Sequence, residues 1–100
     1  MKPFDSSQAQ HGVVLHGIDP ATLQSNRPEL ELSRLQLQHQ LIASGQRRRT
    51  LIQVNRDGII IQGNHGARAA AEMGLPIDVI VVDLPYPTCG PILSIPVVNR

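Results

Sequence analysis

With 100 residues, a formal net charge of +1 and only 2% aromatic residues, the chain fits one small domain with a core of Leu, Ile, Val and Ala. The near-neutral charge excludes a broad positive field, so any contact with nucleic acid has to be local. The single cysteine, Cys89, excludes an internal disulfide and paired-cysteine metal sites, and the sequence holds neither a signal-peptide core nor a stretch as long as a membrane span. We therefore expect a soluble protein of the cytoplasm with no membrane partner.

Changes in composition along the chain predict its organisation. Residues 1–11 are polar and small, which is typical of a flexible lead-in. Residues 12–100 are expected to form a single domain, with a core over about 13–83 and a proline-rich extension over 84–100. The places where this extension could form an edge strand are 92–95 and 97–98.

The first half of the domain predicts one strand and one helix. The run GVVLHGI at 12–18 is typical of a strand, and the DPAT after it predicts a turn or a single helical turn containing Pro20. Leucines at helical spacing predict an amphipathic helix over 33–44, ended by Gly45 in the left-handed conformation. The polar residues expected on its outer face are Arg34, Gln38 and Gln40. The pairs with capping-box spacing, which signal a helix start, are Asn26 with Glu29 and Ser33 with Gln36.

The second half predicts a hairpin, a helix and a buried strand. Asp57 and Gly58 between two β-branched runs are the strongest local signal for a hairpin, with strands over 51–55 and 59–62. The segment ARAAAEMG predicts a short helix closing at Gly74, and IDVIVVD predicts a buried strand. The order strand, helix, hairpin, helix, strand indicates a small α/β (α+β) domain with a mixed sheet and two or three helices.

The segment IQGNHGARAAAE, residues 61–72, places a polar cluster between a strand and a helix. A strand that turns directly into a helix exposes the first backbone N–H groups of that helix, which together with the helix dipole favour an anion. Gly63 and Gly66 would let a phosphate approach the backbone, Arg68 would pair with it, and Asn64 and His65 add polar groups. The alternative is a glycine-rich corner with an Asn or His cap that binds nothing. His65 could also carry a proton near neutral pH.

From Leu51 to Asp83 the chain resembles the ParB/sulfiredoxin superfamily. Its members share a hairpin, a loop of the type G-[ED]-[RH]-R-x-R-A-A or D-G-x-H-R, a helix and a strand. The resemblance extends over about residues 13–83, since LHGIDPATL and LIASG fit the opening strand and the helix before the hairpin. The residues at matching positions of the first loop form are Gly63, Arg68, Ala69 and Ala70. Three residues differ from the family's loop sequences. In the first form, Asn64 stands where an acidic residue is usual and His65 where an arginine is usual. In the second form, Gly66 replaces the arginine that follows the histidine.

The resemblance implies a nucleotide-phosphate pocket at this loop, with ATP or CTP as a ligand and Mg²⁺ as a cofactor. Activities in the family include CTP-dependent DNA partitioning, sulfinic-acid reduction, free serine phosphorylation and nuclease activity. The loop lacks the cysteine of sulfiredoxin, and a partition protein needs a helix-turn-helix domain after this one. A compact copy like this one is similar to toxin domains of bacterial antagonism systems, which would be delivered into a target-cell cytoplasm and bound by an immunity protein.

Further candidates flank the loop. The run Arg47, Arg48, Arg49 would bind phosphates of a nucleic acid or nucleotide. The alternative is a solvated turn with no ligand. Glu29 and Glu31 lie where serine-phosphorylating relatives carry an acidic catalytic residue, so the resemblance implies a general base or a Mg²⁺ ligand; the alternative is a helix cap and a surface carboxylate. Family topology places Asp83 on the same side as the loop, as a metal-ligand candidate.

Two hypotheses follow for the function. In the first, the protein is a nuclease or nucleotide hydrolase in which His65 is the general acid or base, Arg68 stabilises developing charge, and Glu29, Glu31 or Asp83 holds Mg²⁺. A small-molecule kinase of the free-serine type is a variant of this enzyme hypothesis. In the second, the protein is a nucleotide-binding switch or adaptor without turnover.

Overall fold

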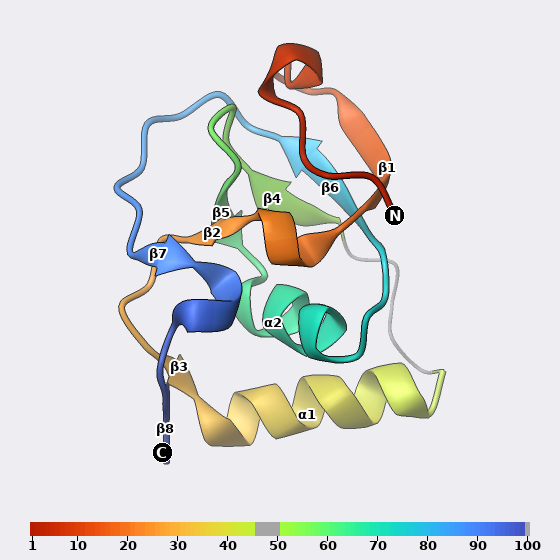
Figure 1. Cartoon of the computed structure of the whole chain (residues 1–100), viewed down its shortest axis with the longest axis vertical. Coiled ribbons are helices and arrows are strands. Elements are labelled where there is room, and N and C mark those ends of the chain that lie inside the picture. Colours follow the sequence, from red (N-terminus) through yellow and green to blue (C-terminus); the bar gives the residue numbers. More distant parts are fainter. Residues whose placement is uncertain (46–50, 100) are drawn as a thin grey trace.

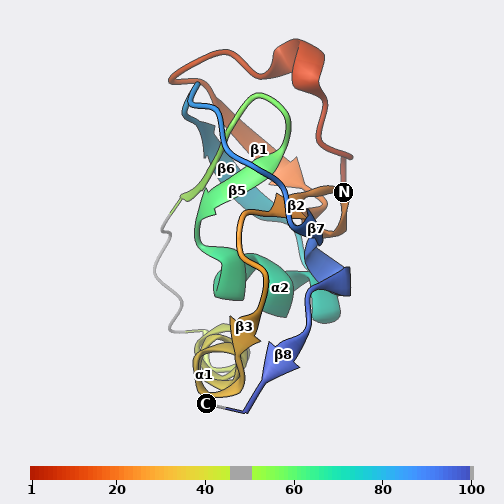
Figure 2. The ribbon, with the colours of Figure 1, turned by 90° about the vertical axis from the view of Figure 1, so that its left-hand side faces the viewer.

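The computed structural model describes residues 1–45 and 51–99. A six-stranded mixed sheet has the strand order β1-β6-β4-β5-β2-β7, and a separate two-stranded sheet pairs β3 with β8. In Figures 1 and 2, helix α2 lies between the larger sheet and helix α1. The elements are β1 (Val14–Ile18), β2 (Gln24–Ser25), β3 (Leu30–Glu31), α1 (Leu32–Ala43), β4 (Ile52–Val54), β5 (Ile59–Gln62), α2 (Asn64–Glu72), β6 (Ile77–Val81), β7 (Gly90–Pro91) and β8 (Val97–Val98), with 3₁₀ turns at Ser6–Gln8, Pro20–Thr22 and Ile92–Ser94.

The core lies around the three central strands β4, β5 and β6, whose sequences are rich in β-branched residues. Val54 of β4, Ile60 of β5 and Val79 of β6 are fully buried. Strand β6 runs parallel to β4, with Ile52 opposite Val79, whereas β5 runs antiparallel to β4. The buried-strand and hairpin predictions are therefore confirmed, and so is the small α+β fold class with its mixed sheet.

Helix α1 starts and ends one residue before the predicted bounds of 33–44, and neither capping box forms. The residue before the helix is Glu31, whose side chain makes no capping hydrogen bond, and Ser33 lies inside the helix. Asn26 starts no helix, because its side chain instead bonds Asn64 and the carbonyl of Ile61. Gly45 is left-handed at φ +71°, as predicted. Among the described residues, no helix is long and apolar enough to cross a membrane.

Helix α2 begins three residues earlier than predicted, so that His65 and Gly66 belong to its first turn. Gly63 makes the corner before it with φ +99°, and a Cβ at this position would lie 3.0 Å from Ile52. This conformation and this contact explain why the strand-to-helix corner carries a glycine. The alanines at 67, 69 and 70 are fully buried, which lets the short helix lie close to its neighbours.

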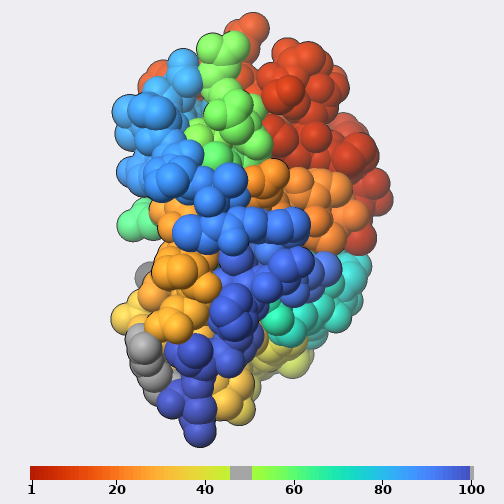
Figure 3. Space-filling view, turned by 60° about the vertical axis from the view of Figure 1, so that its left-hand side comes forward, coloured from red at the N-terminus to blue at the C-terminus, as the bar shows by residue number. Residues whose placement is uncertain are grey.

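Both ends of the chain pack against the domain. The segment 1–11, expected to be a flexible lead-in, places Ala9 in the core and pairs Lys2 with Ile18 of β1. Figure 3 shows this segment in red against the hairpin turn in green. Of the two places expected for an edge strand, residues 97–98 form β8, which runs parallel to β3, whereas Ile92–Ser94 is a 3₁₀ turn.

Candidate functional site

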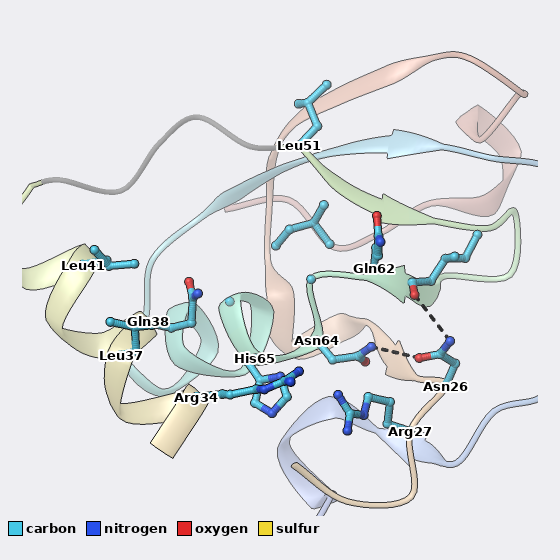
Figure 4. A pocket seen from close by; sticks show the side chains of 14 residues that line it. Asn26, Arg27, Arg34, Leu37, Gln38, Leu41, Leu51, Gln62, Asn64 and His65 are labelled. Carbon is cyan, nitrogen blue, oxygen red and sulfur yellow. Dashed lines mark hydrogen bonds between the residues drawn. The ribbon is translucent and has the colours of Figure 1, made fainter. Parts of the chain in front are cut away.

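A pocket of about 780 Å³ opens between α1, the β4–β5 hairpin and the N-terminus of α2 (Figure 4). This size is typical of a cavity for a small molecule, for which about 300–1,000 Å³ is usual. One end is polar and the other apolar. The polar end is lined by Asn26, Arg27, Arg34, Gly63, Asn64, His65 and Gly66, and the apolar end by Leu37, Leu41, Leu51, Ile52 and Ile61.

The N-terminus of α2 forms part of the polar end. The helix has no side-chain cap, and its first bond runs from the amide of Ala67 to the carbonyl of Gly63 over 2.9 Å. The amides of Asn64, His65 and Gly66 therefore have no partner within the helix. Since Gly63, Asn64, His65 and Gly66 all line the pocket, the structure brings together four of the five residues predicted to bind phosphate.

Asn64 uses its buried side chain to hold the neighbouring loop in place. Its Oδ1 accepts a hydrogen bond from the Ser25 hydroxyl over 2.7 Å, and its Nδ2 donates to Asn26 over 2.9 Å. The Ser25 oxygen also accepts the backbone N–H of Arg27 over 2.9 Å. Both ends of the Asn64 side-chain amide thus make a hydrogen bond within the protein. The bonds connect the start of α2 to Arg27.

His65 is nine-tenths buried and accepts a hydrogen bond at Nε2 from the backbone N–H of Glu31, over 2.9 Å. Because a backbone N–H can only donate, Nε2 is the acceptor and the proton of the neutral ring lies on Nδ1. Burial and the charges of Arg27 and Arg34 lower the pKa of His65 below its ordinary value of 6.5, although Glu31 opposes the shift. Burial and the two arginines therefore favour the uncharged form of the ring. Its Nδ1–H has no hydrogen-bond partner among the residues that the structure describes.

Two arginines complete the polar end. The Nε of Arg34 lies 3.0 Å from one carboxylate oxygen of Glu31, and Nη2 of Arg27 lies 3.9 Å from the other. Glu31 thus bridges the two cations, and its carboxylate is engaged by both. Arg27 and Arg34 are 37% and 62% exposed, so each can also contact a ligand in the pocket.

Sequence reasoning missed both arginines. Arg34 and Gln38 were expected to face solvent because the helix was oriented by its leucines alone. In the structure these two residues share the pocket-facing side of α1 with Leu37 and Leu41. The spacing 34, 37, 38, 41 was a readable signal, since residues three and four apart lie on one face of a helix. Arg27 left no such signal, because the long-range bond between Ser25 and Asn64 sets its position.

Arg68 does not line the pocket. Its Nη1 donates to the carbonyls of Ile92 and Ile95 over 3.0 and 2.7 Å, and its Nε lies 3.3 Å from the carboxylate of Glu72. The side chain is only 13% exposed. The expected phosphate contact is therefore replaced by a structural role, since the guanidinium fixes the C-terminal segment to α2.

Asp83 lies at the opposite end of the sheet from the loop. It follows β6, which is parallel to β4, whereas Gly63 follows β5, which is antiparallel to β4. The carboxylate of Asp83 instead lies 3.6 Å from Arg56 in the hairpin turn. The expectation that Asp83 shares a side with the loop is wrong.

The remaining candidates do not assemble at the pocket either. Glu29 precedes β3 and does not line the pocket. Over residues 1–45 and 51–99, no three His, Cys, Asp or Glu side chains are grouped closely enough to hold a metal ion. The predicted phosphate-gripping run at Arg47, Arg48 and Arg49 lies outside the described residues.

Comparison of the chain with protein-family models, with curated proteins and with solved structures gives no match. The resemblance to the ParB/sulfiredoxin superfamily therefore stays a prediction that rests on the residues of the hairpin, the loop and the following helix. Activity, cofactor and partner assignments that came only from that resemblance stay predictions with it.

Proposed function

We propose that the protein binds a nucleotide in this pocket, with the phosphate at the N-terminus of α2. The observation that carries the proposal is the meeting of three kinds of donor at one end of the cavity. These donors are the unpaired amides of the first helical turn, the Nδ1–H of a neutral His65, and the guanidinium groups of Arg27 and Arg34. Anions are favoured where helix amides, the helix dipole and arginine converge.

The state of His65 supports binding more directly than turnover. A general base needs a free lone pair, and the Nε2 lone pair of this ring already accepts the Glu31 amide. A neutral imidazole is also a poor acid, and burial and the two arginines favour the neutral form. The ring is instead suited to donate one hydrogen bond to an anion. These features favour the nucleotide-binding switch or adaptor over the hydrolase.

The enzyme hypothesis rests on the resemblance alone. No described feature of Glu31 favours the enzyme hypothesis, because both carboxylate oxygens of Glu31 already face arginines. One experiment therefore tests the remaining alternatives, which are a nuclease, a kinase of the free-serine type, and a toxin with its immunity protein. That test is incubation of the protein with ATP, CTP, NAD and plasmid DNA, with and without Mg²⁺, followed by product analysis. Turnover that His65→Ala abolishes would replace the binding proposal by the enzyme hypothesis.

Binding itself is tested by calorimetric titration with ribose 5-phosphate and with nucleotides. Arg34→Gln should weaken binding about 10-fold or more, since hydrogen bonds to charged groups contribute roughly 1.5–3 kcal/mol. The matched control is Arg56→Gln, because Arg56 is 58% exposed and pairs with Asp83 at the other end of the sheet. Absence of binding by the wild type, or equal effects of the two variants, would contradict the proposal.

A further inference from the structure

The apolar end of the pocket leaves large side chains uncovered. Leu37 is 51% exposed although it lies on the pocket side of α1, and Leu41 and Leu51 are only partly buried. Ile61 of the hairpin also lines the pocket and is partly buried. Apolar surface of this kind is stabilised when a flat or apolar group of a ligand covers it. The phosphate end alone gives no reason for such a surface.

Two glutamines lie on opposite walls between the polar and apolar ends. Gln38 projects from α1 and Gln62 from β5, and both line the cavity (Figure 4). Neither side-chain amide has a hydrogen-bond partner in the part of the chain that the structure describes. Each carries both a donor and an acceptor group. Together they offer paired donors and acceptors above an apolar surface, which matches the polar edge and flat faces of a nucleobase.

The charge at the polar end suits a single phosphate group. Arg27 and Arg34 contribute two positive charges, and Glu31 cancels one of them. The N-terminus of α2 adds the equivalent of roughly half a positive charge. A phosphate monoester, with about −1.5 to −2 charges at neutral pH, is close to balance with this end. Each further phosphate of a di- or triphosphate would add uncompensated negative charge.

We propose that the ligand is a nucleoside 5′-monophosphate, whose base lies between Leu37 and Ile61 and is recognised by the amides of Gln38 and Gln62. This inference rests on the proposed function, because it places the phosphate at the same helix end. It adds the ligand class and two specificity-determining residues. The amides select among bases, and Leu37 and Ile61 hold the ring without selecting.

The test is calorimetric titration of the wild-type protein with AMP, CMP, GMP, UMP and ribose 5-phosphate. At least one mononucleotide should bind about 10-fold or more tightly than ribose 5-phosphate, since the base adds apolar contact and hydrogen bonds. Gln38→Met and Gln62→Met keep the length of the side chain and remove its amide. Each substitution should weaken binding of the preferred mononucleotide about 3- to 10-fold and leave the affinity for ribose 5-phosphate unchanged. The matched control is Gln40→Met, an exposed residue of α1 that does not line the pocket.

The outcomes separate the two proposals. Equal affinity for the mononucleotides and ribose 5-phosphate, with the Arg34→Gln effect intact, would overturn the base site and keep the phosphate site. Tighter binding of the triphosphate than of the monophosphate without metal would overturn the single-phosphate assignment. Binding of an oligonucleotide with no binding of any mononucleotide would overturn the ligand class. Loss of affinity in Gln40→Met equal to that in Gln38→Met would overturn the role of the amides.

Discussion

The backbone N–H of Glu31 donates to Nε2 of His65 over 2.9 Å and so ties the end of β3 to the first turn of α2. This single bond occupies the Nε2 lone pair and places the ring proton on Nδ1. It also makes stability depend on pH. The bond requires an unprotonated Nε2, and protonation of the ring would remove the acceptor.

We expect His65 to make the protein less stable in mild acid. Its pKa in the folded state lies below the unfolded value near 6.5, because of burial and then the two arginines. Between these two values the unfolded chain binds a proton that the folded chain does not, so the contribution is present above about pH 6.5 and is lost as the pH falls. Urea denaturation from about pH 8 to about pH 5 should show this slope in the wild type and a shallower one in His65→Gln. An unchanged slope in His65→Gln, or an equal change in the exposed control His16→Gln, would contradict the assignment.

We expect Arg68→Gln to destabilise the fold and to leave ligand affinity unchanged. The substitution removes a charged donor from the carbonyls of Ile92 and Ile95 and leaves Glu72 without this partner. The loss should be about 2–4 kcal/mol, because buried carbonyls lose their bonds to a charged group. Urea denaturation measures the loss, with Arg56→Gln as the exposed control. A loss of phosphate affinity at unchanged stability would restore the role in phosphate binding expected for Arg68.

We expect Glu31→Gln to tighten anion binding several-fold. The carboxylate of Glu31 faces both pocket arginines, so its removal frees their donors and raises the local positive charge. The backbone bond to His65 is retained, because it comes from the main chain of residue 31. Titration with ribose 5-phosphate measures the effect, and raising the salt concentration should reduce it. Weaker binding in Glu31→Gln would show that the carboxylate itself is needed.

We expect Ser25→Ala to weaken ligand binding through Arg27. The serine oxygen accepts the Arg27 amide, and its hydroxyl donates to Asn64, so its loss frees the loop that carries the arginine. Stability should fall by about 1–3 kcal/mol, as expected for buried polar groups left unpaired. Affinity and stability are measured on the same sample. If Arg27→Gln and Ser25→Ala weaken binding additively rather than overlapping, the positioning role is wrong.

We expect Gly63→Ala to be more damaging than Gly17→Ala. Both glycines have positive φ, at +99° and +68°, but only the Cβ at residue 63 would meet another side chain, at 3.0 Å from Ile52. Gly17→Ala should cost about 1 kcal/mol from backbone strain, and Gly63→Ala about 1–3 kcal/mol more from the added contact. Thermal unfolding of the two variants provides the comparison, and equal losses would show that the contact is relieved without cost.

Local signals in the chain were sufficient for several elements. The Asp57-Gly58 turn between two β-branched runs specifies the hairpin, and the buried run at 77–81 specifies a central strand. Gly63 identifies the strand-to-helix corner, because few other residues adopt its positive φ. These features depend on residues within a few positions of each other, and therefore the sequence by itself determined the hairpin, the corner and the location of the candidate site.

Only the tertiary structure decided which side chains serve that site. Arg68 was expected at the phosphate. Its guanidinium instead donates to the carbonyls of Ile92 and Ile95, which lie more than twenty residues away in the sequence. Asp83 was expected near the loop, but the parallel pairing of β6 with β4 places it at the far end of the sheet. Arg34 was expected on the outer face of its helix; it is 62% exposed there, and the packing of α1 also places it beside the pocket. A long side chain reaches several partners from one backbone position, so its partner depends on which distant segments folding brings within reach.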